Sequence, residues 1–195
     1  MKVAIIDYNA GNTRSVQFAL ERLGVVPILT KEAAVLSEAD KVIFPGVGAA
    51  NSTMAYLEQT GLDVVIKNLK KPVLGICLGM QLLCDFSEEG NVKGLGIFPQ
   101  QVKRFMPQKG MKVPHMGWNQ LSCEPTALLE GVASGSYVYF VHGYYVEASV
   151  HTIARCNYGG AFSAALHKDN FYATQFHPEK SGSVGAKILK NFIDL

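Results

Sequence analysis

The sequence of 195 residues contains no long apolar segment, no large excess of one charge and no closely spaced pair of cysteines. No apolar run approaches the roughly 20 residues of a membrane-spanning helix. The net charge of +2 gives no reason to expect a nucleic acid or a membrane as partner. The four cysteines lack CxxC spacing, and a strand pattern begins at Lys2, where a signal peptide would stand. We therefore expect reduced thiols, no bound metal or cofactor, and a cytoplasmic location.

The composition, with 17% charged and 48% hydrophobic residues, is typical of a single α/β domain spanning residues 1–195. In the first half, short apolar runs alternate with helical patterns, which predicts a parallel sheet covered by helices on both faces. The second half has strand-like runs with few helices, so we expect antiparallel and mixed strands added to the same sheet. The expected strands are 3–6, 25–29, 41–44, 72–74, 101–105, 118–121, 137–141, 152–157, 163–167 and 171–175; the expected helices are 13–23, 49–59, 62–69 and 181–194.

The most informative segment is Gly75-Ile76-Cys77-Leu78-Gly79, which stands between an apolar strand and a helical pattern. A nucleophile flanked in this way by glycines is typical of a nucleophile elbow, in which glycines permit a tight strand-to-helix turn. The start of a helix favours the thiolate form of a cysteine. A small buried cysteine is the alternative interpretation, so Cys77 needs partners before it can be called a nucleophile.

Those partners are offered by Phe176-His177-Pro178-Glu179, which directly follows another expected strand. Strand ends on one rim are where open α/β sheets collect their sites. With the carboxylate of Glu179 on one ring nitrogen, the other nitrogen of His177 can face a thiol. The Leu78 N–H and an N–H from the segment 45–48 are the expected oxyanion donors.

Two motifs together resemble the signatures of the class I glutamine amidotransferases: residues 75–81, which end at Gln81, and residues 175–179. The segment Pro45-Gly46-Val47-Gly48 is similar to the oxyanion segment of one branch, the glutaminase subunits of imidazole glycerol phosphate synthase. Residues 7–12, 114–119 and 139–144 agree with that branch, so the resemblance covers nearly the whole chain. It implies a flavodoxin-like, three-layer α/β/α fold with a mixed, mostly parallel central sheet.

The resemblance implies a reaction in which Cys77 attacks the side-chain amide of L-glutamine. His177 would transfer the proton, Glu179 would hold the imidazole, and water would hydrolyse the glutamyl thioester. A serine is common where this chain has Gly143, whose backbone N–H can still make the contact. The matching oxyanion positions are Leu78, Val47 and Gly48, and the matching substrate positions are Gly46, Gln81, Gly143 and Tyr144.

The resemblance also implies a protein partner, a separate (β/α)₈-barrel cyclase subunit. Ammonia would pass to that subunit, which forms imidazole glycerol phosphate and an aminoimidazole carboxamide ribotide in histidine biosynthesis. The positions expected at or near this interface are Asn12, which is also placed to cap the helix 13–23, together with Trp118, Tyr144 and Lys180.

Two other interpretations stay open at this point. One is the glutaminase of another pathway, such as pyridoxal phosphate synthesis, although the segments 45–48 and 114–119 argue against it. The other is a catalytically silent scaffold that retains the fold and binds partners. We also expect weak activity in isolation, because the peptide at Val47, between two glycines, could rotate between two donor arrangements.

Overall fold

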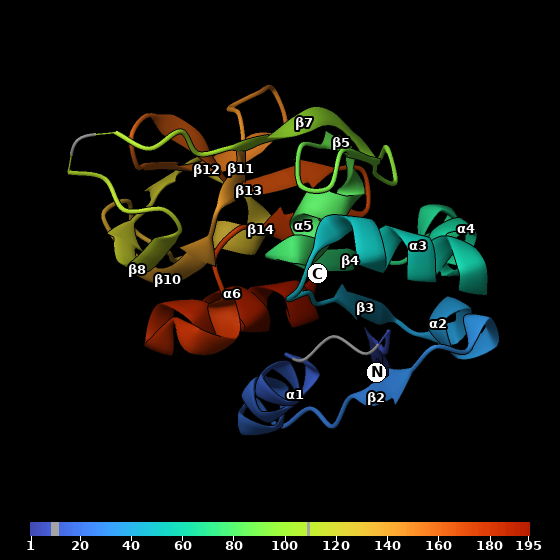
Figure 1. The fold of residues 1–195 in the computed structure, drawn as a ribbon. Helices are drawn as coiled ribbons and strands as arrows, with labels where there is room; N and C mark the ends of the chain where they lie inside the picture. The colour runs from blue at the N-terminus through green and yellow to red at the C-terminus, as the bar shows by residue number, and fades with distance from the viewer. Residues whose placement is uncertain (9–11, 109) are drawn as a thin grey trace.

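A central sheet of eight strands organises the computed structural model, which describes residues 1–8, 12–108 and 110–195 (Figure 1). Asn9, Ala10 and Gly11 of the N-terminal motif therefore lie outside the described residues. The first five strands in spatial order run parallel, and the last three join them antiparallel. That order is β2 (Ile28–Thr30), β1 (Val3–Ile6), β3 (Lys41–Phe44), β4 (Val73–Ile76), β14 (Phe171–Thr174), β13 (Ala161–Lys168), β12 (Thr152–Asn157) and β9 (Ser122–Cys123).

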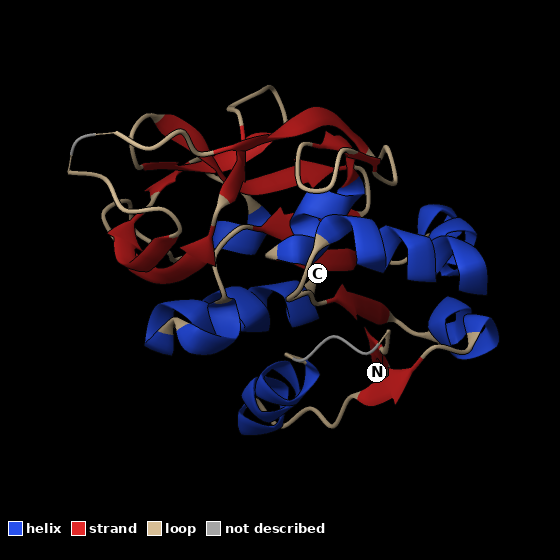
Figure 2. Ribbon diagram, in the orientation of Figure 1, coloured by secondary structure: helices blue, strands red, loops and turns tan. Residues whose placement is uncertain are grey.

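Helices cover both faces of this sheet, which confirms the expected three layers (Figure 2). One face carries α1 (Thr13–Arg22), α6 (Gly182–Asp194) and the short 3₁₀ helix η1 (Ala127–Leu129). The other face carries α2 (Ala33–Glu38), α3 (Ala50–Thr60), α4 (Leu62–Asn68) and α5 (Leu78–Leu83). None of the helices in the part of the chain that the structure describes has the length and hydropathy to cross a lipid bilayer.

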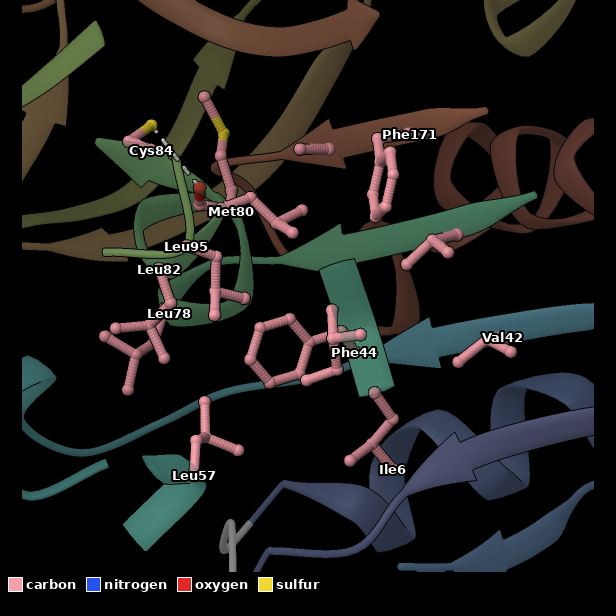
Figure 3. Close-up of a cluster of buried hydrophobic side chains, with 14 of the residues drawn as sticks. Ile6, Val42, Phe44, Leu57, Leu78, Met80, Leu82, Cys84, Leu95 and Phe171 are labelled. Atoms are coloured by element: carbon pink, nitrogen blue, oxygen red, sulfur yellow. Dashed lines mark hydrogen bonds between the residues drawn. The ribbon is translucent and has the colours of Figure 1, made fainter. Parts of the chain in front are cut away.

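The inner parallel strands β1, β3 and β4 are buried along their whole length, as their continuous apolar runs predict, whereas Ile28 and Leu29 of the edge strand β2 are exposed. Along β1, Ile5 packs with the cluster under α1 and α6, whereas Ile6 packs with the opposite cluster. Figure 3 shows that second cluster, in which Ile6 and Phe44 lie between the sheet and the helices. The side-chain alternation of strands thus divides the core into two layers, with the sheet between them.

The middle of the chain differs from the expectation, because its strands, β9 excepted, do not join the central sheet. Strands β8 (His115–Gln120) and β10 (Tyr137–His142) form a separate antiparallel ribbon, which we call the β8–β10 ribbon. Their buried and exposed residues alternate, so one face of the ribbon can meet solvent, unlike the strands of the central sheet. The remaining strands, β6 (Val92–Lys93), β5 (Cys84–Ser87), β7 (Phe98–Arg104) and β11 (Tyr144–Val146), form a four-stranded sheet.

Close contact between α5 and β3 generates a prediction about Gly79. A Cβ atom at this position would lie 2.0 Å from the carbonyl oxygen of Phe44, a backbone atom of β3 that can shift only if the strand pairing is disturbed. We expect Gly79→Ala to lower the free energy of unfolding by about 2–3 kcal/mol, measured by urea denaturation. Gly143→Ala is the control, since its Cβ would meet nothing within 4 Å. Equal stability of the two variants would contradict this packing argument.

Candidate active site

Cys77 occupies a sharp turn between β4 and α5. Its backbone has φ 54 and ψ −106, a strained conformation for a residue with a side chain. The positive φ falls on the cysteine itself, so the expectation that the flanking glycines supply the strained turn is wrong. They supply close packing instead, because a Cβ at Gly75 would lie 2.7 Å from the Leu83 side chain and one at Gly79 would strike β3. The elbow thus has a rigid base beneath a strained nucleophile.

His177 and Glu179 stand just beyond the end of β14, where the short 3₁₀ helix η2 (Pro178–Lys180) begins. The Nδ1 atom of His177 lies 2.8 Å from Oε1 of Glu179, and both side chains are fully buried. The backbone of His177 is fixed as well, because its N–H donates to the Tyr139 carbonyl at 2.9 Å and its carbonyl accepts from the Ser181 hydroxyl at 2.7 Å. The imidazole and the carboxylate are therefore held in one orientation.

The three side chains interact electrostatically. Burial lowers the pKa of His177, but interactions with the Cys77 sulfur and the Glu179 carboxylate outweigh burial and raise it to about 10. Burial raises the pKa of Glu179, but the hydrogen bond and charge of His177 hold it below its usual value. The imidazole therefore holds a proton at neutral pH beside an ionised carboxylate. Its Nε2 atom is buried without a hydrogen bond among the described residues.

Asn12 directly precedes α1, yet its side chain does not cap the helix. Its Nδ2 atom donates to Oε1 of Glu179 at 2.6 Å and lies 3.3 Å from Nδ1 of His177. The side chain is buried, so within this chain Asn12 supports the carboxylate that orients the imidazole. The sequence indicated the helix start correctly but carried no local signal for this long-range contact.

A cavity of about 290 Å³ lies at the rim where these residues meet. Cys77 and His177 line it together, which confirms in space the convergence that their motifs predict. Gly46 does not line it, and neither do Trp118 and Lys180. Glu89, Pro114 and Val141 line it without having been assigned to the site from the sequence, and His142 lines it from a segment that resembles the family, where it was expected to shape the site. The other lining residues are Val47, Gly48, Leu78, Gln81, Gly143 and Tyr144, all of them expected site positions.

The oxyanion position is closed in this structure. The Leu78 N–H donates to the Gly46 carbonyl at 3.4 Å, so this donor is engaged within the chain. The preceding carbonyl, of Pro45, accepts from the Tyr8 hydroxyl. Gly46 is also tightly enclosed, because a Cβ there would lie 2.6 Å from that hydroxyl and 2.7 Å from Leu78. The segment therefore packs so closely that only a glycine fits at position 46.

Two polar side chains of the site were missed by sequence reasoning. Gln175 accepts a hydrogen bond from Gln81 at 3.0 Å, and its own Nε2 lies 3.8 Å from the Cys77 sulfur. Gln175 is the first residue of the recognised motif 175–179, so the sequence did contain a signal for it. Glu89 accepts from the backbone N–H of Ala50 at 3.1 Å, and burial raises its pKa. No pattern around Glu89 distinguishes it from an ordinary loop carboxylate.

The expected interface residues are divided between the site and the outer surface. Trp118 is 55% exposed on the β8–β10 ribbon, where its ring centroid lies 6.0 Å from that of Tyr139. Met116 and Tyr137, also exposed, stand on the same ribbon. Lys180 is exposed at the end of η2, beside the triad. The outer face of the ribbon thus presents several large apolar groups to solvent.

Known proteins resemble this chain over its full length. Residues 4–195 match the family "Glutamine amidotransferase class-I". Proteins named "Imidazole glycerol phosphate synthase subunit HisH" are 62% identical in Bacteroides fragilis, 59% in Bacteroides thetaiotaomicron and 47% in Yersinia pseudotuberculosis. Each of these alignments covers 100% of both chains.

Solved structures agree on the fold. A putative GMP synthase subunit from Thermoplasma acidophilum has a TM-score of 0.76 at 21% identity, with 100% of this chain and 92% of that chain covered. A structure described as glutamine amidotransferase also has a TM-score of 0.76, at 18% identity, covering 100% of this chain and 98% of that chain. The expected flavodoxin-like fold is confirmed. The chain belongs to the class I glutamine amidotransferases and, within them, to the family of imidazole glycerol phosphate synthase subunits HisH.

Proposed function

We propose that this single domain hydrolyses the side-chain amide of L-glutamine and delivers the ammonia to a cyclase subunit of imidazole glycerol phosphate synthase, in histidine biosynthesis. The observation that carries the proposal is the meeting of Cys77 and His177 in one cavity, with Glu179 hydrogen bonded behind the imidazole. A cytoplasmic location with reduced thiols suits this chemistry, since all four cysteines are free.

In the first half of the reaction the Cys77 sulfur attacks the amide carbon of glutamine. The strained turn lifts the sulfur toward the cavity, so little motion is needed to reach a bound substrate. His177 holds the proton, as its raised pKa requires, and delivers it to the departing nitrogen. A glutamyl thioester and ammonia result.

In the second half, water attacks the thioester and glutamate leaves. His177, now deprotonated, accepts a proton from that water and so returns to its starting state. Glu179, anchored by Asn12, keeps the imidazole in one tautomer and stabilises its charged form.

Substrate recognition follows from the charges around the cavity. Glu89 is the acidic side chain among the residues that line it, and its carboxylate suits the α-ammonium group of glutamine. The backbone N–H groups of Gly143 and Tyr144 are the donors proposed for the α-carboxylate. Gln81 uses both of its amide hydrogens within the chain, at Tyr144 and Gln175, which leaves its carbonyl oxygen free to accept from the substrate.

Replacement of the nucleophile tests the proposed chemistry. We expect Cys77→Ala to reduce glutamate formation by about four orders of magnitude or more, measured in the complex with the cyclase. Cys123→Ser is the matched control, since this half-buried thiol lies outside the cavity, and it should retain full activity. A Cys77→Ala protein that still consumed glutamine would refute the mechanism, and an inactive parent protein would favour a silent scaffold.

The closed oxyanion position suggests control by the partner. While the Leu78 N–H is bound to the Gly46 carbonyl, the tetrahedral intermediate lacks donors. Rotation of the peptide between Gly46 and Val47 would withdraw this carbonyl and present the Val47 N–H, with Gly48 giving the segment freedom to turn. This rotation would keep ammonia production low until the cyclase is bound and carries its own substrate, a state that we call the loaded complex.

Val47→Pro tests this rotation, because proline has no N–H to present. We expect kcat for glutamine in the loaded complex to fall by about 10² to 10³-fold, the usual effect of one lost oxyanion donor. Val47→Ala retains the N–H and should stay within a few-fold of the parent. Similar rates for both variants would show that the Val47 N–H is not the donor.

The relatives are subunits of a synthase, and the outer face of the β8–β10 ribbon is the surface best suited to meet a (β/α)₈-barrel cyclase. Trp118 and Tyr137 are enriched types at protein interfaces, and both are exposed here. The exposed Lys180 adds a charge next to Ser181, which bonds Tyr139 of β10, while Asn12 bonds Glu179 and Tyr144 lines the cavity. The ribbon also contributes Val141 to the cavity, so this surface adjoins the site.

Truncation of the tryptophan tests this interface. We expect Trp118→Ala to weaken binding of the cyclase about 30-fold, measured by titration calorimetry, because exposed aromatic anchors dominate such interfaces. Val64→Ala, which removes an apolar side chain that is 56% exposed on α4, should leave the affinity unchanged. Equal affinities for the two variants would place the cyclase on another surface.

A further inference from the structure

Two histidines that the proposed mechanism does not use are buried beside the cavity. His115 begins β8 and His142 ends β10, where they form a cross-strand pair. Nδ1 of His115 lies 3.0 Å from Nε2 of His142. The His115 ring stacks against Phe140 and Tyr158, at centroid distances of 4.7 and 3.9 Å, so its plane is fixed. A pair of rings held this tightly has few ways to place its hydrogens.

The hydrogen bonds determine which nitrogen carries each proton. Nδ1 of His142 lies 2.7 Å from the Tyr144 carbonyl, which can only accept, so Nδ1 must donate. Burial lowers the pKa of His142 to about 3 and that of His115 to about 4, so both rings are neutral. Nε2 of His142 is then an acceptor, and His115 must donate to it from Nδ1. The remaining Nε2 of His115 accepts from the Asn119 amide at 3.3 Å.

The same chain of contacts continues to the sulfur. The Tyr144 carbonyl also accepts from Nε2 of Gln81 at 3.1 Å, and Gln81 donates its second hydrogen to Oε1 of Gln175 at 3.0 Å. This leaves the Gln175 amide only one direction, with Nε2 turned toward Cys77 at 3.8 Å. Each donor in the series is matched to one acceptor, from Asn119 on the ribbon to the nucleophile.

We propose that Gln175 is a positioning residue that donates a hydrogen bond to the Cys77 sulfur, and that the neutral His115–His142 pair holds it in that orientation through Tyr144 and Gln81. This inference rests on the role of Cys77 proposed above. An N–H directed at the sulfur limits rotation of the Cys77 side chain away from the substrate and keeps the sulfur in the position from which it attacks. If either histidine lost its partner, the Tyr144 carbonyl could turn and the Gln81 and Gln175 amides could flip together.

Thiol reactivity, measured without glutamine, tests whether Gln175 donates a hydrogen bond to the Cys77 sulfur. Gln175→Met keeps the side-chain volume but removes the donor and the acceptor. We expect iodoacetamide to alkylate Cys77 about three- to tenfold more slowly at pH 7 in this variant, measured peptide by peptide by mass spectrometry. Cys123, half-buried and outside the network, is the internal reference and should react at its parent rate. An unchanged rate at Cys77 would overturn the proposal, even if Cys77→Ala had confirmed the nucleophile.

Paired substitutions of His142 test the second part. His142→Asn keeps an N–H at the position of Nδ1 and should recover most of the Cys77 alkylation rate. His142→Leu loses that donor and should reproduce the slowing seen in Gln175→Met, while raising KM for glutamine in the cyclase complex. His167→Asn, a change at a half-buried histidine on β13 whose ring bonds the Asp169 carbonyl and stacks on Tyr172, controls for loss of a ring. Equal Cys77 alkylation rates in His142→Asn and His142→Leu would contradict the proposal that the histidine pair orients Gln175, whatever the result for Gln175→Met.

Discussion

Parallel pairing of β4 with β14 is the constraint on which the rest of the site depends. Ile76 stands opposite Thr174 in this pair, and the Cys77 N–H continues the ladder by donating to the Thr174 carbonyl at 2.7 Å. Because both strands end together at one rim, the nucleophile and the imidazole meet although they are distant in sequence. A slip of one residue in this register would turn Gln175 away from Gln81 and from the sulfur. The helices and the two core layers hold this one alignment.

Burial lowers the pKa of all three histidines of this site, yet their charge states differ. His177 lies against a carboxylate and a sulfur, so it stays charged although it is fully buried. The ring nitrogens of His115 and His142 bond each other, a carbonyl and an amide, none of them charged, and burial therefore keeps both rings neutral. Neighbouring groups, and not depth, thus decide which of these buried rings is charged and which are neutral.

Sequence alone predicts the elbow, the triad and most of the central sheet, because these features depend on local patterns. The run 152–157 and the helix around 182–194 are examples, since continuous burial and a regular apolar stripe mark them. The β8–β10 ribbon was assigned to the wrong sheet, because alternation shows which faces are buried but not which strand pairs with which. The short helix α2 was not predicted from the sequence. Leu36 is its only buried residue, so its sequence shows almost no apolar stripe. Contacts such as Asn12 with Glu179, or the closed Gly46 carbonyl, arise from tertiary packing and have no sequence signal.

The wall of the cavity has a consequence for the fate of the product. Val141 lines the cavity, while its cross-strand neighbour Met116 stands exposed on the ribbon. Since directly paired residues of two strands point to the same face, the cavity adjoins the exposed face of the ribbon that we propose as the docking surface. Ammonia released in the cavity would therefore have a short path to a subunit docked there. It would then have little opportunity to pick up a proton from bulk water, which would convert it to an unreactive cation.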